Sequence, residues 1–114
     1  MQSKFALVML CCALAGSYGA QAAPGKTELN LDAKEGAEYF HFPEGAQLKV
    51  TGLYCPAAVT VSVTCRTAAH ARCGKWYLGL NGTAASGPKG DIGIASVDYS
   101  GPDSCKATVV VTSP

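Results

Sequence analysis

Residues 58–65, AVTVSVTC, constrain the fold more than any other part of the chain. Apolar and polar side chains alternate here, and the apolar set is predicted to face one way: Val59, Val61, Val63 and Cys65. A period of two with β-branched residues is typical of a half-buried β-strand. Residues 105–112, CKATVVVT, repeat the pattern with a second inward set: Cys105, Ala107, Val109 and Val111. Two such segments favour a fold built from strands.

The rest of the chain after residue 22 shows short alternating runs and no helical period. Five weaker strand candidates are spread along it: residues 28–32, 37–42, 46–52, 75–80 and 91–99. Turn sequences rich in Gly, Pro, Asn and Asp separate them: FPEG, YCPA, NGTAASGPKG and SGPDS. This pattern predicts an all-β fold, a small disulfide-stabilised β-sandwich or barrel of about six to seven short strands. Residues 23–114 are expected to form a single domain.

The N-terminal segment has the composition of a secretory signal peptide. Lys4 precedes the apolar run FALVMLCCALAG, and small residues stand at Ala20 and Ala22. A charged start, a short apolar run and a small-x-small cleavage pattern predict removal of residues 1–22. A membrane anchor would need about 20 apolar residues, and a bacterial lipoprotein would need a small residue directly before its cysteine. We therefore expect a secreted protein, extracellular or, in a bacterium, periplasmic, with no transmembrane segment in the mature chain.

Four of the six cysteines remain after removal of residues 1–22: Cys55, Cys65, Cys73 and Cys105. An even number of cysteines in a short exported chain predicts disulfide bonds, which matter in a domain too small for a large core. A metal site would need Cys or His at close spacing, and the sequence has neither C-x-x-C nor H-x-x-x-H. No metal site and no cofactor are predicted.

The strand pattern narrows the three possible pairings of these cysteines. Cys55 and Cys65 stand at the two ends of one strand candidate, about 30 Å apart when extended, whereas a disulfide needs Cα atoms roughly 4.4–6.8 Å apart. If segment 81–90 crosses back over the fold, Cys65 meets Cys73 at one end and Cys55 meets Cys105 at the other. The remaining pairing needs a second long crossing, for which the chain has no segment. We predict Cys65–Cys73 and Cys55–Cys105 bridges.

Residues 67–77, TAAHARCGKWY, lie within the longest part of the chain without an acidic residue. Between Ala46 and Gly90 every ionised side chain is positive: Lys49, Arg66, Arg72, Lys75 and Lys89. Segment 28–44, by contrast, contains five of the eight acidic residues. Without Lys4 the chain has eight basic and eight acidic residues. The uneven distribution of these charges predicts a positive surface that attracts an anionic macromolecule or an acidic protein surface.

The predicted Cys65–Cys73 bridge would hold residues 66–72 in a small exposed ring, because a buried loop leaves backbone groups unsatisfied. Trp76 shares a strand face with the leucines two and four positions later, which places Trp76 in the core and Tyr77 outside. The predicted binding residues of this basic aromatic loop are Arg66, His70, Arg72, Lys75 and Tyr77. The alternative interpretation is a solvated basic loop beside an ordinary core tryptophan.

One set of side chains could support catalysis. A His/Glu pair beside an arginine can cleave RNA by general acid–base chemistry, with the arginine neutralising phosphate charge. The candidates for such a set are His41, His70, Arg66 and either Glu38 or Glu44. No serine-nucleophile elbow is present in the sequence, and the predicted bridges leave no cysteine of the mature chain as a nucleophile. The enzyme hypothesis depends on whether these residues meet in a cleft.

These features resemble, in a general way, small secreted cysteine-containing β-proteins, a group that includes microbial inhibitors, toxins and host-directed effectors. Similarity at this level does not transfer function. The favoured hypothesis is surface binding of the effector, toxin or inhibitor type through the basic aromatic loop. The alternatives are a small secreted hydrolase of the ribonuclease type and a structural coat or cell-wall component. A structural component would have an exposed apolar patch or an unprotected sheet edge.

Overall fold

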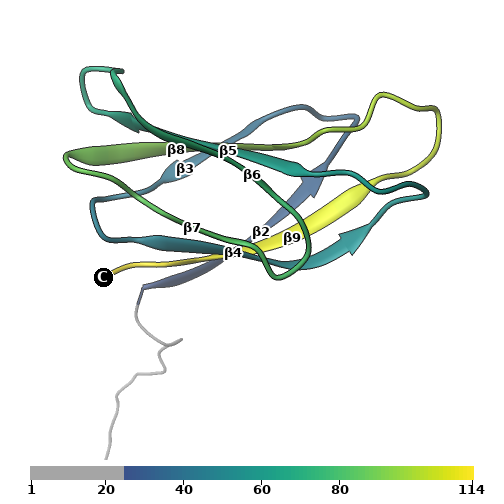
Figure 1. The fold of residues 1–114 in the computed structure, drawn as a ribbon, viewed down its shortest axis with the longest axis horizontal. Coiled ribbons are helices and arrows are strands. Elements are labelled where there is room, and N and C mark those ends of the chain that lie inside the picture. The colour runs from purple at the N-terminus through teal and green to yellow at the C-terminus, as the bar shows by residue number, and fades with distance from the viewer. Residues whose placement is uncertain (1–24) are drawn as a thin grey trace, which may run out of the picture.

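The computed structural model describes residues 25–114, so the predicted signal peptide lies outside the described residues. This part of the chain forms strands and no helix. The strands are β2 (Lys26–Asp32), β3 (Glu38–His41), β4 (Gln47–Tyr54), β5 (Val61–Thr67), β6 (Arg72–Leu78), β7 (Thr83–Ala85), β8 (Gly90–Val97) and β9 (Lys106–Thr112). They form two four-stranded antiparallel sheets that pack face to face (Figure 1). The predicted all-β fold is confirmed, and of the two predicted architectures, sandwich and barrel, it is the sandwich. No helix in residues 25–114 is long and apolar enough to span a membrane.

The chain passes back and forth between the two sheets, which gives the sandwich a jelly-roll strand order. The first sheet has the order β2-β9-β4-β7, and the second sheet has the order β3-β8-β5-β6. β2 and β9 pair over their full length, from Lys26 opposite Thr112 to Asp32 opposite Lys106. This pairing joins the two ends of the described chain and closes the fold.

Each of the seven predicted strand segments contains a strand, although the bounds differ. The segment predicted from residue 58 becomes a strand only at Val61, because residues 55–60 carry the chain from the first sheet to the second. An eighth strand, β7, falls in the segment NGTAASGPKG, which the sequence assigns to a loop. β7 pairs with β4, with Ala85 opposite Gln47, but three residues are too few for an alternating pattern to stand out.

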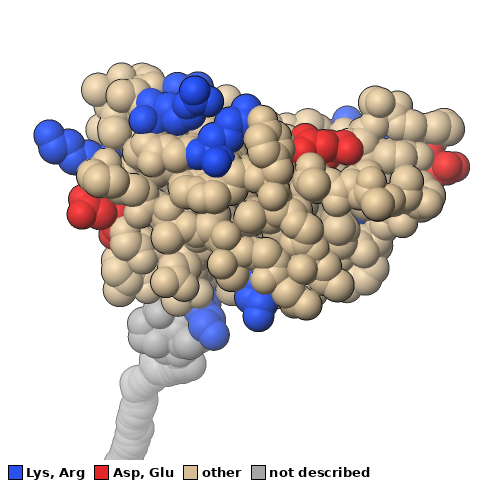
Figure 2. Space-filling model, viewed as in Figure 1, with Lys and Arg blue, Asp and Glu red and all other residues tan. Residues whose placement is uncertain are grey.

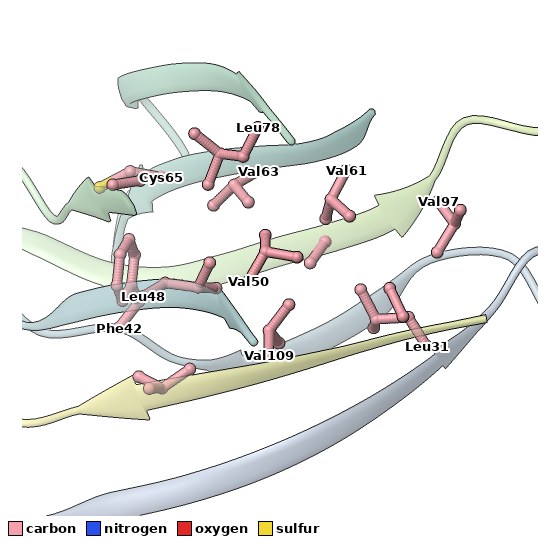
Figure 3. Packing of buried hydrophobic residues seen from close by; sticks show 14 of the residues in the cluster. Leu31, Phe42, Leu48, Val50, Val61, Val63, Cys65, Leu78, Val97 and Val109 are labelled. Carbon is pink, nitrogen blue, oxygen red and sulfur yellow. The ribbon is translucent and has the colours of Figure 1, made fainter. Parts of the chain in front are cut away.

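The core lies between the sheets and consists of the inward side chains at alternate strand positions (Figure 3). Val61 and Val63 of β5 face Val50 and Val109 of the first sheet, and all four side chains are fully buried. The other predicted inward positions of β9 are buried as well. Val59, which precedes β5, is only partly buried against this cluster. The alternating pattern thus identifies the inward faces of the two central strands β5 and β9.

Two disulfides connect adjacent strands at opposite ends of the sandwich. Cys55 follows β4 and bonds to Cys105, which precedes β9, with an S–S distance of 2.04 Å. Cys65 in β5 bonds to Cys73 in β6, with Cα atoms 5.0 Å apart. These are the pairs expected from the sequence. The crossing that this pairing requires is present, because β6 and β8 both run antiparallel to β5 and residues 79–89 connect them.

Removal of the two bridges should destabilise the fold unequally. The Cys55–Cys105 bridge spans 50 positions of the chain, and the Cys65–Cys73 bridge spans 8. A bridge that closes a longer loop removes more conformational entropy from the unfolded chain. We therefore expect the Cys55→Ala/Cys105→Ala variant to lose about 4 kcal/mol of unfolding free energy and the Cys65→Ala/Cys73→Ala variant about 2.5 kcal/mol. Each bridge contains one fully buried cysteine, so the lost core volume is comparable. Denaturant unfolding measures both losses, and equal or reversed values would contradict this explanation.

Candidate binding surface

β5 and β6 form a hairpin, and residues 68–71 form its tip. Of the predicted ring of residues 66–72, the four residues 68–71 form an exposed turn, while Arg66, Thr67 and Arg72 belong to the two strands. Arg66 lies on β5 and Arg72 lies on β6, directly opposite each other. Their backbones are held by the sheet ladder, so the two guanidinium groups project from a regular scaffold.

Hydrogen bonds fix the tip of the hairpin. The Thr67 amide donates to the Ala71 carbonyl oxygen at 2.8 Å, and the His70 amide donates to the Thr67 carbonyl oxygen at 2.8 Å. His70 has a φ of 68°, a left-handed conformation that lets the chain reverse within four residues. Arg66 donates from Nη1 to the His70 carbonyl oxygen at 2.8 Å. The arginine therefore braces the turn while its remaining N–H groups stay available.

A β-bulge beside Cys65 brings its disulfide partner into place. Cys65 lies opposite Gly74, and the next pair is Arg66 with Arg72, so Cys73 is an additional residue on β6. In such a bulge two residues of one strand oppose a single residue of the other. Cys73 and Gly74 therefore both face Cys65, whose side chain is fully buried. The bulge keeps the bridge on the inner side of the sheet.

Alternation then places the predicted binding residues on the outer face of the second sheet. Cys65 points into the core, so its neighbour Arg66 points outward. Across the ladder, Arg72 lies opposite Arg66, and Lys75 lies opposite Thr64. Figure 2 shows positive side chains gathered over this part of the second sheet. We call this surface the basic face and define it by Arg66, Arg72, Lys75 and Tyr77, with His70 at the adjoining hairpin tip.

Aromatic side chains accompany these cations. Tyr77 is 63% exposed, and Lys75 Nζ lies 5.5 Å from its ring centroid, within the range of a cation–π interaction. Tyr39 on β3 is 70% exposed and lies opposite Ile94, which lies opposite Thr64. Tyr39 therefore shares the outer face of the second sheet with the basic face. This position of Tyr39 could not be predicted from the sequence, because no local pattern reveals that β3 pairs with β8.

Neighbouring acidic groups do not neutralise the basic face. The ion-pair contact found within residues 25–114 joins His41 Nδ1 to Asp91 Oδ1 at 3.8 Å, and it involves no residue of the basic face. Asp98 follows β8 and accepts hydrogen bonds from Thr60 Oγ1 at 2.8 Å and Ser62 Oγ at 2.6 Å. Hydroxyl groups thus satisfy this carboxylate without the cations. The three positive charges of the basic face remain open to an external anion.

Trp76 lies on the inner side of β6, as predicted. It is partly buried and packs against the core. Its indole ring lies over Gly74, where a Cβ atom would contact the ring directly. The prediction that Leu80 shares this face is wrong: Leu80 is 55% exposed, because β6 ends at Leu78 and the chain then turns toward the first sheet.

The contact of Trp76 with Gly74 can be used to test whether the indole ring packs on the inner side of β6. In the Gly74→Ala variant the new methyl group would overlap the ring, so the indole must move outward. We expect a loss of about 1–3 kcal/mol of unfolding free energy, the usual cost of overpacking, and a red shift in tryptophan fluorescence. The chain contains one tryptophan, so the emission reports on this site alone. Gly79→Ala is the matched control, because a Cβ atom there meets no atom within 4 Å. Unchanged emission in Gly74→Ala would contradict the packing.

The structure does not bring the proposed catalytic set together. His41 lies on β3 and Arg66 on β5, with β8 between them, so roughly 10 Å separates their strands. Glu44 is engaged elsewhere: its Oε1 accepts a hydrogen bond at 2.8 Å from a backbone amide before β8. Glu38 is three positions from His41 on the same strand and therefore faces the opposite side. His70 presents its carbonyl oxygen to Arg66. Hydrogen-bonded acid–base chemistry among these five residues is not supported.

Metal binding is not indicated either. No group of three or more His, Cys, Asp or Glu side chains in the described part of the chain could hold a metal ion. Comparisons with known protein families, with curated proteins and with solved structures found no match to this chain. The function must therefore be argued from the surface of the protein.

Proposed function

We propose that the protein is a small secreted binding protein that recognises an anionic macromolecule through its basic face. The observation that carries the proposal is the placement of Arg66, Arg72 and Lys75 on one sheet surface, with no ion-pair partner among residues 25–114. Such a cluster attracts negative charge, and the attraction is not offset by internal pairing. Secreted proteins of the effector, toxin or inhibitor type can act through such a surface without catalysis.

The opposed arginines are the centre of the proposed site. Arg66 and Arg72 are cross-strand neighbours, and the Cys65–Cys73 bridge ties their two strands together. Like charges directly opposite each other on a sheet repel and reduce stability. An anionic group bound between them would remove this repulsion, and a guanidinium can bind phosphate, sulfate or carboxylate oxygens in bidentate fashion. The opposed arginines therefore lower the stability of the free protein and favour its complex with an anion.

Two further contacts favour binding at this surface. Arg66 uses Nη1 to brace the hairpin, which reduces the side-chain entropy lost when a ligand binds. A guanidinium has five N–H donors, so donors remain for a ligand. Tyr77 lies beside Lys75 and is 63% exposed, so it offers a ring for apolar contact next to the charges. The face thus combines fixed positive charge with an aromatic surface.

The proposal is tested by removing the three cations together. The Arg66→Ala/Arg72→Ala/Lys75→Ala variant should keep its fold, because Arg72 and Lys75 are exposed and the lost hydrogen bond from Arg66 to His70 should cost only about 1 kcal/mol. Its binding to heparin and to single-stranded poly(U) should weaken. The slope of log affinity against log salt for poly(U) should fall by about two, since each contact contributes about 0.7. Fluorescence titration over a range of salt concentrations measures both quantities.

A variant with the same change in net charge provides the control. Lys26→Ala/Lys34→Ala/Lys49→Ala removes three exposed lysines that lie outside the basic face, and it should bind both polyanions as the wild type does. If both triple variants lose affinity equally, net charge explains the binding and the basic face does not. If the wild type binds neither polyanion at low salt, nor an acidic protein, the proposal is wrong.

The enzyme hypothesis is tested in the same experiment. The His41→Ala/His70→Ala variant removes both histidines of the chain and leaves the three cations in place. We expect it to keep most of its affinity for poly(U), because Arg66, Arg72 and Lys75 carry the charge of the basic face, and to show no difference in RNA cleavage. If the histidine variant abolishes a turnover that the basic triple variant retains, the enzyme hypothesis replaces surface binding.

Secretion is part of the proposal and rests on the pattern of residues 1–22 and on the two disulfides, which form in oxidising compartments. Material exported by the native host should begin near Ala23. Intact-mass analysis should therefore show a chain without residues 1–22. Recovery of the full-length chain, or of a lipid attached to Cys11 or Cys12, would contradict the predicted signal peptide.

A further inference from the structure

The outer face of the first sheet carries two successive depressions along β9, which together we call the groove. Its floor consists of the outward β9 side chains Thr108, Val110 and Thr112, because the residues between them are buried in the core. One depression of about 290 Å³ includes Val110 and Thr112 in its lining, and a second of about 420 Å³ includes Thr108. The groove extends along the seven residues of β9, or roughly 20 Å.

Longer side chains on the two neighbouring strands form the walls of the groove. Lys26 of β2 and Gln47 of β4 both lie opposite Thr112, one on each side. Lys49 of β4 lies opposite Val110 in the same way. The β9 side chains are shorter than those of Lys26, Gln47 and Lys49 on the neighbouring strands, so the floor of the groove lies below its walls. These three wall residues, together with Val110 and Thr112, line the smaller depression.

Tyr54 provides a flat aromatic surface at the other end of the groove. Its ring lies over Gly52, where a Cβ atom would stand 2.8 Å from the ring, so the ring fits against the strand because Gly52 has no side chain. Tyr54 nevertheless remains 68% exposed, and it lines the larger depression together with Asn30 and Thr108. A large aromatic ring that is held against a sheet but left in solvent is suited to stack on a ligand.

The lining disfavours a polyanion. Lys26 and Lys49 line the smaller depression, whereas Asp32, Glu35 and Lys106 line the larger one. The charged side chains thus favour a polyanion at the smaller depression and disfavour it at the larger one, so a chain of negative charges would not be attracted along the whole groove. The surface instead offers hydroxyl, amide, carboxylate and ammonium groups, which together both donate and accept hydrogen bonds. This mixture matches a ligand with many neutral hydroxyl groups.

The backbone of the floor disfavours an extended peptide. Peptides that add to a sheet use unpaired N–H and C=O groups at an edge strand. β9 is paired along its length with β2 on one side and with β4 on the other. A ligand of this groove must therefore be recognised by side chains.

We propose that this groove binds an uncharged oligosaccharide. One sugar ring stacks its C–H face on Tyr54, and the following rings lie along β9 toward Gln47. Asn30 and Thr108 exchange hydrogen bonds with sugar hydroxyl groups beside the stacked ring. The length of the groove accommodates several linked sugars. The site lies on the first sheet, and the basic face lies on the second, so the two sites are separate and can be occupied together.

The experiment titrates the isotope-labelled, disulfide-bonded protein with three uncharged hexasaccharides: β-1,4-linked glucose, β-1,3-linked glucose and β-1,4-linked N-acetylglucosamine. We expect at least one of them to shift the backbone amide signals of β9 and β4. Tyr54→Ala should weaken that binding about tenfold, as truncation of a tyrosine anchor usually does. Its thermal unfolding should stay close to that of the wild type, because the ring is mostly exposed.

Tyr39→Ala is the matched control, because Tyr39 is 70% exposed on the second sheet and lies outside the groove. It should bind the oligosaccharide as the wild type does. The Arg66→Ala/Arg72→Ala/Lys75→Ala variant should also bind normally, so this proposal and the proposed function can fail separately. The proposal is overturned if none of the three hexasaccharides shifts these signals, if the shifts map to the second sheet, or if Tyr54→Ala binds as tightly as the wild type.

Discussion

Cys65 occupies the position on which the arrangement of the basic face depends. Its side chain is fully buried and bonded to Cys73. Its sulfur lies 3.3 Å from the Oγ of Ser86, which in turn donates to the Phe42 carbonyl oxygen at 2.8 Å. One buried cluster therefore connects β5, β6, the segment after β3 and the segment after β7. The hydroxyl of Ser86 is buried but hydrogen-bonded, so it ties these segments together without leaving an unsatisfied polar group.

The inward position of Cys65 also fixes the direction of its neighbours. Side chains alternate along a strand, so a slip of one residue in β5 would expose Cys65 and bury Arg66. Burial of an unpaired guanidinium is strongly unfavourable, and the same slip would separate Cys65 from Cys73. The Cys65–Cys73 disulfide and the cost of burying the Arg66 guanidinium therefore favour the same register of β5. This register sets Arg66 and Arg72 opposite each other on the outer face, and the bulge at Cys73 reconciles that pairing with the disulfide.

Local patterns and non-local pairing explain which features could be predicted from the sequence. Alternation is local, so the inward faces of β5 and β9 can be predicted from the sequence. The two predicted bridges are also correct, although Cys55 and Cys65 do not end one strand as expected, because residues 55–60 connect the two sheets. The partner of a strand is not local. The position of Tyr39 beside the basic face depends on the pairing of β3 with β8. The flat placement of Tyr54 depends on its contact with Gly52. The short strand β7 owes its existence to its pairing with β4.

The jelly roll gives the protein two outer surfaces that share a core but no side chains. Packed sheets lie roughly 10 Å apart, and effects at sites this far apart without common partners usually add. Each face can therefore acquire its own ligand without disturbing the other. The two faces point in opposite directions, so a neutral polysaccharide held along β9 would leave the basic face directed away from it, toward a second, anionic molecule. The protein would then connect the two ligands. A rigid sandwich is sufficient for this connection, because it requires two occupied faces and no movement between the sheets.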